Sequence, residues 1–116
     1  MEIAYLMAGK RFQAQDVAEL NQQLTPYNLK TNSDDVCEGV RRSSDAEGNF
    51  RYLIQQSHGD PADFEGYDVV VGKELGNNGY GQPDVVEVEP SRLEIVLNEV
   101  KEDIPDAKLI VGSYWS

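Results

Sequence analysis

The chain has one cysteine, one histidine and one tryptophan among its 116 residues. The single cysteine, Cys37, cannot form an internal disulfide, as is usual for proteins of a reducing compartment. With His58 as the only histidine, a zinc site of the Cys/His type is excluded, because such sites need several ligands of these two types. We therefore expect a cytoplasmic protein with no metal ion and no cofactor.

Long hydrophobic runs are missing as well. No stretch approaches the roughly 18 consecutive apolar residues of a membrane-spanning helix. The first ten residues, MEIAYLMAGK, carry an acid at position 2 and an apolar run too short for a signal peptide. The sequence therefore predicts no membrane partner.

Basic residues are scarce: Lys and Arg total 10 against 21 Asp and Glu, a net charge of −11. Direct binding to DNA or RNA depends on Lys and Arg that displace counterions from phosphates. Anionic membrane surfaces also attract basic segments, because opposite charges attract. Both kinds of surface are therefore disfavoured as direct partners.

The acidic residues that are present are concentrated in one part of the chain. Residues 60–106 hold 13 acids and three bases, a net charge of −10, whereas residues 1–59 hold 8 acids and 6 bases. A field of this strength attracts basic molecules and repels acidic ones. The composition thus indicates the chemistry of a partner without naming one.

The length and the hydrophobic share of 40% predict one folded domain over residues 1–116. In the first half, Val17, Leu20 and Leu24 have helical spacing, and Phe50, Tyr52 and Ile54 alternate with other side chains as in a strand. The expected elements there are a strand at 3–8 ended by Gly9, a helix at 13–24 ended by Pro26, a loop at 27–35, and a hairpin of strands 36–42 and 50–56 turning at 45–49.

In the second half, the three consecutive valines of residues 67–71 are typical of a strand buried on both faces. Residues 72–83 contain four glycines, which indicates a hairpin connection to a short exposed strand at 85–88. The helix that starts at Pro90-Ser91 is the clearest element, because its apolar residues fall on one stripe (Leu93, Val96, Leu97, Val100 and Ile104). A last strand is expected at 109–115.

These elements predict an α+β fold: a single compact domain with an antiparallel-rich sheet and two helices on one face. Without residues 67–88, the order is βαββαβ, the ferredoxin-like arrangement. The sequence therefore predicts a ferredoxin-like variant with an inserted acidic hairpin, which either extends the sheet or projects from it.

Two segments resemble catalytic or ligand-binding motifs only in part. The loop at 58–65 gathers His58 with three carboxylates, which could hold a divalent cation or form an acid–base pair, but it lacks the spacing of a calcium loop. The stretch at 70–81 has glycines and Lys73 after a strand, without the Gly-Lys-Ser/Thr order of a phosphate-binding loop. A solvated turn and a glycine-rich connection explain them better. The basic pair Arg41-Arg42 is interpreted as a partner for local ion pairs.

The acidic region remains as the main candidate site. Its acids lie in the 60–68 loop, the 84–89 strand and the outer face of the second helix, with aromatic residues among them. Aromatic anchors surrounded by carboxylates are typical of a surface that docks a basic protein. The candidate partner-binding residues are Asp60, Asp63, Phe64, Glu65, Tyr67, Asp68, Glu74, Tyr80, Asp84, Glu87, Glu89, Glu94, Glu99 and Glu102.

We expect a small acidic, non-enzymatic protein that binds and inhibits a basic protein partner, such as a nuclease toxin or a nucleic-acid-binding complex. Its charge profile is similar to that of immunity proteins, phage-encoded inhibitors and nucleic-acid mimics. One alternative is a ferredoxin-like enzyme or ligand-binding module that uses His58 with a carboxylate such as Asp60. A second is a regulatory subunit that self-associates through an edge strand, for which Tyr114 and Trp115 mark the C-terminal strand. A monomer or a homodimer fits these hypotheses.

Overall fold

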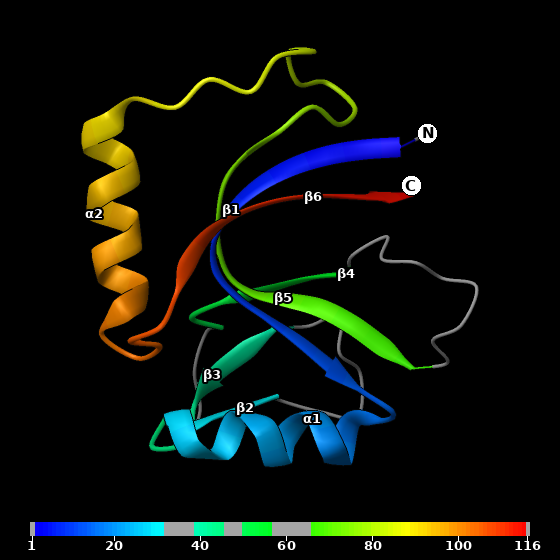
Figure 1. Cartoon of the computed structure of the whole chain (residues 1–116), viewed down its shortest axis with the longest axis vertical. Coiled ribbons are helices and arrows are strands. Elements are labelled where there is room, and N and C mark those ends of the chain that lie inside the picture. Colours follow the sequence, from blue (N-terminus) through cyan, green and yellow to red (C-terminus); the bar gives the residue numbers. More distant parts are fainter. Residues whose placement is uncertain (1, 32–38, 46–49, 57–65, 116) are drawn as a thin grey trace.

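The computed structural model describes residues 2–31, 39–45, 50–56 and 66–115. Figure 1 shows how the elements in these ranges are arranged. They are β1 (Glu2–Ala14), α1 (Val17–Leu24), the 3-10 helix η1 (Thr25–Tyr27), β2 (Leu29–Thr31), β3 (Val40–Arg42), β4 (Leu53–Gln56), β5 (Tyr67–Asn77), α2 (Pro90–Lys101) and β6 (Lys108–Trp115).

Two antiparallel sheets are present in the described residues. The larger has the strand order β4-β5-β1-β6, and the smaller is the ribbon of β2 and β3. The long strand β1 pairs with β5 along residues 5–14 and with β6 along residues 2–9. The predicted class, a compact α+β domain with an antiparallel sheet and two helices, is confirmed.

Two facing glycines explain why β1 does not end where the sequence predicted. Gly9 pairs with Gly72 of β5, and a Cβ atom on Gly72 would lie 2.0 Å from the carbonyl oxygen of Ala8. The strands approach so closely here that no side chain fits between them. Gly9 and Gly72 therefore lie inside long strands, and the predicted strand ends at residues 8 and 71 were wrong.

The first helix begins later than predicted because Asp16 and Glu19 cap it. The Glu19 backbone N–H donates to Asp16 Oδ1 (2.8 Å), and the Gln15 N–H donates to Glu19 Oε2 (2.7 Å). The first of these bonds satisfies an amide donor that the first turn leaves unpaired, and the second holds the residue before the cap against the helix. The helix thus spans Val17–Leu24, and residues 13 and 14 belong to β1.

The main hydrophobic core lies on one face of the larger sheet. Even-numbered residues of β1, such as Ala8 and Phe12, pack there with Leu20 of α1 and Val100 of α2. Both helices therefore contribute to the same core. On the opposite face, a smaller cluster contains Tyr5, Met7 and Val70, with Ile110 and Tyr114 packed against it.

The ferredoxin-like βαββαβ order is not matched, because the chain has six strands in the described residues. The additional strands are β2 and β3, which lie between α1 and β4. Residues 29–31 were expected in a loop but form β2, and β2 pairs with β3. The predicted hairpin of 36–42 with 50–56 is reduced to one bridge, Val40 with Tyr52, among the described residues. Residues 36–38 and most of the predicted turn lie outside them.

The predicted acidic hairpin at 67–88 was also wrong. Residues 67–77 form β5, an interior strand of the larger sheet, and residues 78–89 contain no strand. The helix α2 and the strand β6 are confirmed near their predicted positions, although Ile104 lies just beyond the end of α2. No helix of the described residues has the length and apolar character needed to span a membrane.

Candidate functional site

The structure divides the predicted site residues into groups with different surroundings. Asp60, Asp63, Phe64 and Glu65 lie outside the described residues, as do His58 and Cys37. Tyr67 is half-buried and packs against the main core, so it is not an exposed anchor.

Asp68 is a buried carboxylate that is bound within the fold. It forms a two-point ion pair with Arg11, whose Nε donates to Asp68 Oδ1 at 2.7 Å. The hydrogen bond from Arg11 outweighs the effect of burial and lowers the pKa of Asp68. Because this charge is already compensated, it contributes little to the field that a partner meets.

Glu74 and Glu99 are also engaged. Glu74 Oε2 accepts a hydrogen bond from Gln55 Nε2 (3.0 Å), and its other oxygen accepts one from Asn77. Glu99 Oε2 lies 2.7 Å from Lys73 Nζ, and this hydrogen bond lowers the pKa of Glu99. The Lys73–Glu99 ion pair connects β5 to α2.

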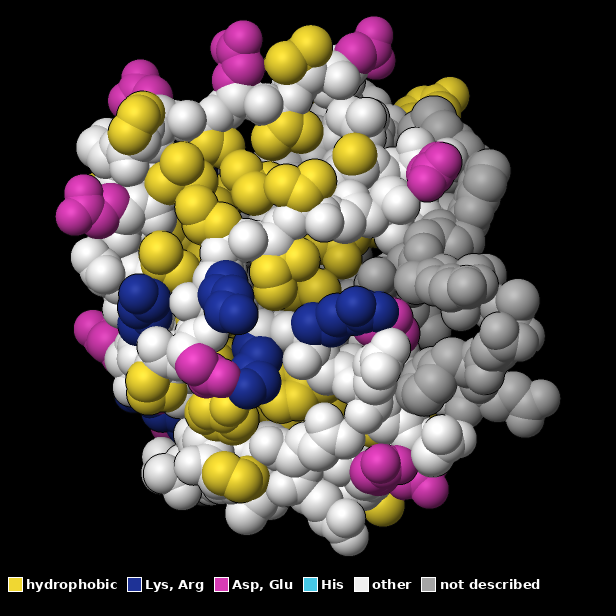
Figure 2. All heavy atoms as spheres, in the orientation of Figure 1, with side chains coloured by type: hydrophobic (Ala, Val, Ile, Leu, Met, Phe, Trp, Pro, Cys, Tyr) yellow, Lys and Arg dark blue, Asp and Glu magenta, His cyan; other side chains and the backbone are white. Residues whose placement is uncertain are grey.

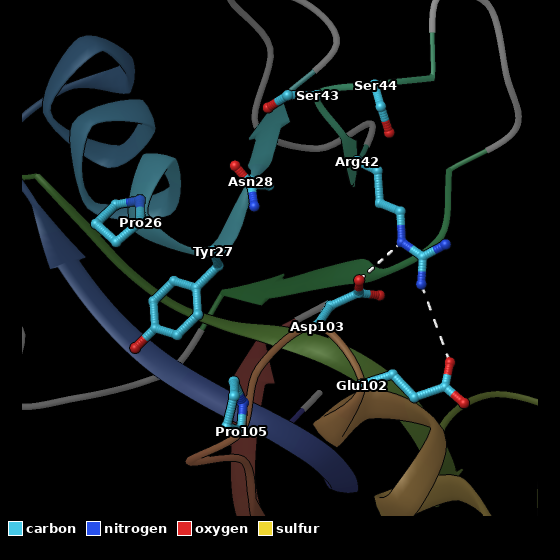
Figure 3. Close-up of a pocket in the computed structure, with 9 residues that line it drawn as sticks. All are labelled: Pro26, Tyr27, Asn28, Arg42, Ser43, Ser44, Glu102, Asp103 and Pro105. Carbon is cyan, nitrogen blue, oxygen red and sulfur yellow. Dashed lines mark hydrogen bonds and ion pairs between the residues drawn. The ribbon is translucent and has the colours of Figure 1, made fainter.

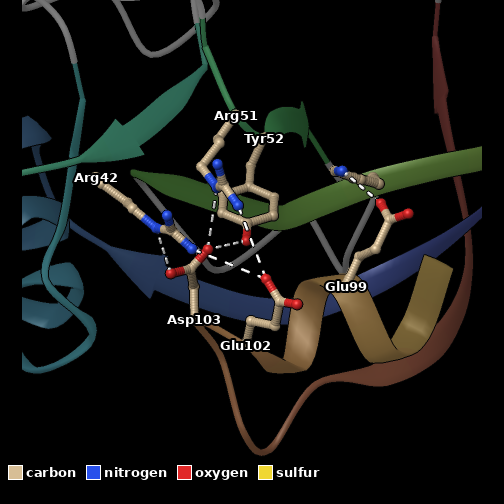
Figure 4. Close-up of polar contacts among 7 residues, drawn as sticks. Arg42, Arg51, Tyr52, Glu99, Glu102 and Asp103 are labelled. Atoms are coloured by element: carbon tan, nitrogen blue, oxygen red, sulfur yellow. Dashed lines mark hydrogen bonds and ion pairs between the residues drawn. The ribbon is translucent and has the colours of Figure 1, made fainter. Parts of the chain in front are cut away.

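Asp103, just beyond α2, is the centre of a polar cluster that the sequence did not predict (Figure 4). Arg42 Nε donates to Asp103 Oδ1 at 2.7 Å. Asp103 Oδ2 accepts hydrogen bonds from Arg51 Nε (3.2 Å) and from the Tyr52 hydroxyl. Glu102 Oε2 lies 3.9 Å from a terminal nitrogen of each arginine. The cluster ties the end of α2 to β3 and to the residues before β4.

Burial and hydrogen bonds together determine the ionisation of Tyr52 and Asp103. Burial, followed by the hydrogen bond to Asp103, raises the pKa of the Tyr52 hydroxyl to about 12. At Asp103, burial favours the protonated form, but the hydrogen bonds from Arg42 and Tyr52 outweigh it and the pKa is lowered. Tyr52 is therefore a neutral donor and Asp103 a charged acceptor near neutral pH.

A cavity of about 530 Å³ lies beside the cluster (Figure 3). Its walls come from η1, from the end of β3 and from the end of α2, and they are lined by Pro26, Tyr27, Asn28, Arg42, Ser43, Ser44, Glu102, Asp103 and Pro105. Among the described residues that line it, Arg42 is the one cation, and it is bound to Asp103 beside the negative charge of Glu102. These described residues therefore offer no uncompensated positive charge for an anionic ligand.

Within the described ranges, no three His, Cys, Asp or Glu side chains come together in a way that could hold a metal ion. The interpretation of Arg41-Arg42 as a local ion-pair partner is confirmed for Arg42.

The remaining predicted residues gather on and next to residues 78–89, which we call the acidic strap. The strap connects β5 to α2 and is anchored at both ends. Ala4 N–H donates to Asn78 Oδ1 at 2.7 Å, and Asn78 N–H donates to the Ala4 carbonyl at 3.1 Å. Further along, Val86 lies over Gly76, where an added Cβ would be only 2.7 Å from Val86 Cγ1, and Val88 packs against the main core.

The strap exposes its acids together with apolar side chains. Asp84, Glu87 and Glu89 of the strap and Glu94 of α2 are exposed, and their carboxylates make no hydrogen bond or ion pair with another described residue. In the same stretch of sequence, Tyr80 is 96% exposed, Val85 65% and Ile95 60%. Figure 2 shows acidic side chains standing along the upper edge of the molecule, where the strap runs. Five of the predicted residues therefore lie exposed along the strap and the start of α2: Tyr80, Asp84, Glu87, Glu89 and Glu94.

Searches with known protein family models, against curated proteins and against solved structures found no match to this chain.

Proposed function

We propose that this protein is a non-enzymatic inhibitor that binds a basic protein through the acidic strap and the first turns of α2. The partner is a nuclease or a nucleic-acid-binding protein, and the carboxylates occupy positions that phosphates take on its basic groove. The proposal includes action in the cytoplasm as a monomer or homodimer, without a cofactor.

One observation carries the proposal: the sorting of the acidic residues by the fold. Asp68 and Asp103 are neutralised by arginines at buried positions and Glu99 by Lys73 at the surface, whereas Asp84, Glu87 and Glu89 are exposed and their carboxylates are unpaired within the described residues. Unpaired charge at a surface accelerates encounter with a partner of opposite charge.

The exposed apolar side chains among these acids support the same function. Exposed acidic residues without apolar neighbours need no binding role, because surface charge also keeps a protein soluble. Tyr80, Val85 and Ile95 add apolar area that water does not favour, and interfaces combine such anchors with a charged rim.

The test is capture of basic proteins from a lysate of the producing cells, followed by calorimetric titration of the purified partner. The strap variant Asp84→Asn/Glu87→Gln/Glu89→Gln removes three charges while it keeps side-chain size. The control Glu2→Gln/Glu19→Gln/Asp45→Asn removes three charges elsewhere. We expect the strap variant to bind at least about tenfold more weakly and the control to bind like the wild type.

Binding is also expected to weaken steeply between about 50 mM and about 500 mM salt, as screening shortens the range of the charges. The inhibitory part of the proposal is checked by the partner's nuclease or nucleic-acid-binding activity. Equal weakening in the strap variant and the control would show that net charge alone acts, and would contradict a defined binding surface.

A further inference from the structure

The helix α2 is packed along only part of its length. Near its end, Val100 is fully buried, and Ile104 just beyond it is buried as well. Closer to its start, Leu93, Val96 and Leu97 of the apolar stripe are only partly buried. A helix at the surface of a complete core normally covers this stripe. The first half of α2 therefore presents apolar area that the described residues leave open.

The neighbouring edge of the sheet is open on the same face. Leu109 and Val111 of β6 pair with Ala8 and Leu6 of β1, and residues that pair across antiparallel strands point to the same face. That face is the one on which α2 packs, because Ala8 and Leu6 belong to the main core. Leu109 is 44% exposed and Val111 78% exposed.

We call the partly buried and exposed apolar side chains of α2, β1 and β6 on this side of the sheet the α2–β6 face: Leu6, Leu93, Val96, Leu97, Leu109 and Val111. Figure 2 shows hydrophobic side chains gathered between α2 and the strands, with basic side chains along their lower border. The ion pair of Lys73 with Glu99 connects the sheet to α2. Along the upper border runs the acidic strap, with Asp84, Glu87 and Glu89.

The negative charge of the acidic strap favours some occupants of the α2–β6 face over others. A second copy of the chain would bring its own strap and its own net charge of −11 toward the same acids. A basic segment would instead gain from them. Because α1 and α2 already pack on this sheet face, an occupant with an apolar helical stripe would extend the layer of helices.

We propose that the α2–β6 face binds an amphipathic helix of the basic partner, with the helix's apolar stripe on Leu109 and Val111 and its Lys and Arg residues toward the strap. This inference rests on the proposed function and identifies the kind of segment that the inhibitor recognises.

The probe is a dye-labelled Leu/Lys peptide of about 18 residues that forms an amphipathic helix, compared with a scrambled peptide of the same composition. Binding to the full chain is measured by fluorescence anisotropy. We expect the amphipathic peptide to bind at least about tenfold more tightly than the scrambled one.

The variant Leu109→Thr/Val111→Thr makes the face more polar at two exposed positions and keeps residues that suit a strand. The matched control is Leu53→Thr, because Leu53 is 48% exposed and pairs with Gly72, which places it on the opposite face of the sheet. We expect about tenfold weaker binding of the amphipathic peptide for the double variant and no change for the control. Circular dichroism and thermal melting of each variant check that it is folded.

Unchanged affinity of the folded double variant would overturn the inference. If the strap variant still weakened binding in that case, the proposed function would stand without it. If sedimentation shows a wild-type dimer that Leu109→Thr/Val111→Thr dissociates, a second copy occupies the face and the inference is wrong.

Discussion

The Tyr52 hydroxyl donates a hydrogen bond to Asp103, which also accepts one from Arg42. Tyr52 is buried and immediately precedes β4, whereas Asp103 follows α2. The contact therefore joins the larger sheet to the helix through side chains that are far apart in the sequence.

Replacement of Asp103 by Asn is expected to destabilise the fold by about 2–3 kcal/mol, because it removes the charge that faces two arginines and leaves their donors poorly matched. Urea unfolding followed by circular dichroism measures this loss. The neighbouring variant Glu102→Gln serves as control, since Glu102 is exposed and 3.9 Å from both arginines. Its effect should stay within about 0.5 kcal/mol, and equal losses in both variants would contradict the central place of Asp103.

Alkaline pH is expected to weaken the fold through Tyr52. Its pKa is raised to about 12 in the folded protein, mainly by burial, from an ordinary value near 10. A raised pKa contributes stability below pH 10, and this contribution is lost as the pH rises from about 10 to about 12. The loss is on the order of 2 kcal/mol. Urea unfolding at several pH values measures it, and Tyr52→Phe should lack this component. If Tyr52→Phe and the wild type lose stability in parallel, the prediction is wrong.

The variant Gly72→Ala is expected to cost about 3 kcal/mol, because its new methyl group would meet the Ala8 carbonyl oxygen of the paired strand. Gly81→Asn is a suitable comparison: Gly81 has a φ of +80° with nothing within 4 Å of an added Cβ, and Asn tolerates this backbone region. Guanidinium unfolding of both variants should show a loss below about 1 kcal/mol for Gly81→Asn. A similar midpoint for Gly72→Ala and the wild type would mean that β1 and β5 can separate without cost.

The elements that the sequence predicted well are those that local pattern determines. The helix α2 has an apolar stripe and a proline at its start, and β6 is a run of residues suited to strands. The ends of β1 and β5 were predicted wrongly because glycine is in general a poor strand former. Here glycine is required inside both strands, because the two strands approach closely at Gly9 and Gly72. The three residues of β2 are too few to show a period.

The sequence predicted the negative charge of the candidate site, but not which of its acidic residues are exposed. Asp68 and Asp84 look alike in the sequence, yet Asp68 is buried against Arg11 and Asp84 is exposed. The pairing of β1 with β5 places Arg11 beside Asp68, whereas no described basic side chain forms an ion pair with Asp84. The cluster around Asp103 was missed for the same reason, because its arginines reach it only through tertiary packing.

The position of β1 in the sheet has a kinetic consequence. Its residue Glu2 pairs with Trp115 of β6, so the sheet is completed by contacts of very long sequence separation. Such contacts close large loops, and folding that depends on them is slow. Until β6 docks, one edge of β1 remains unpaired and open to pairing with other chains. Chains with a net charge of −11 repel one another during this interval, so the acidic residues that we propose for partner binding would also oppose aggregation before the sheet is complete.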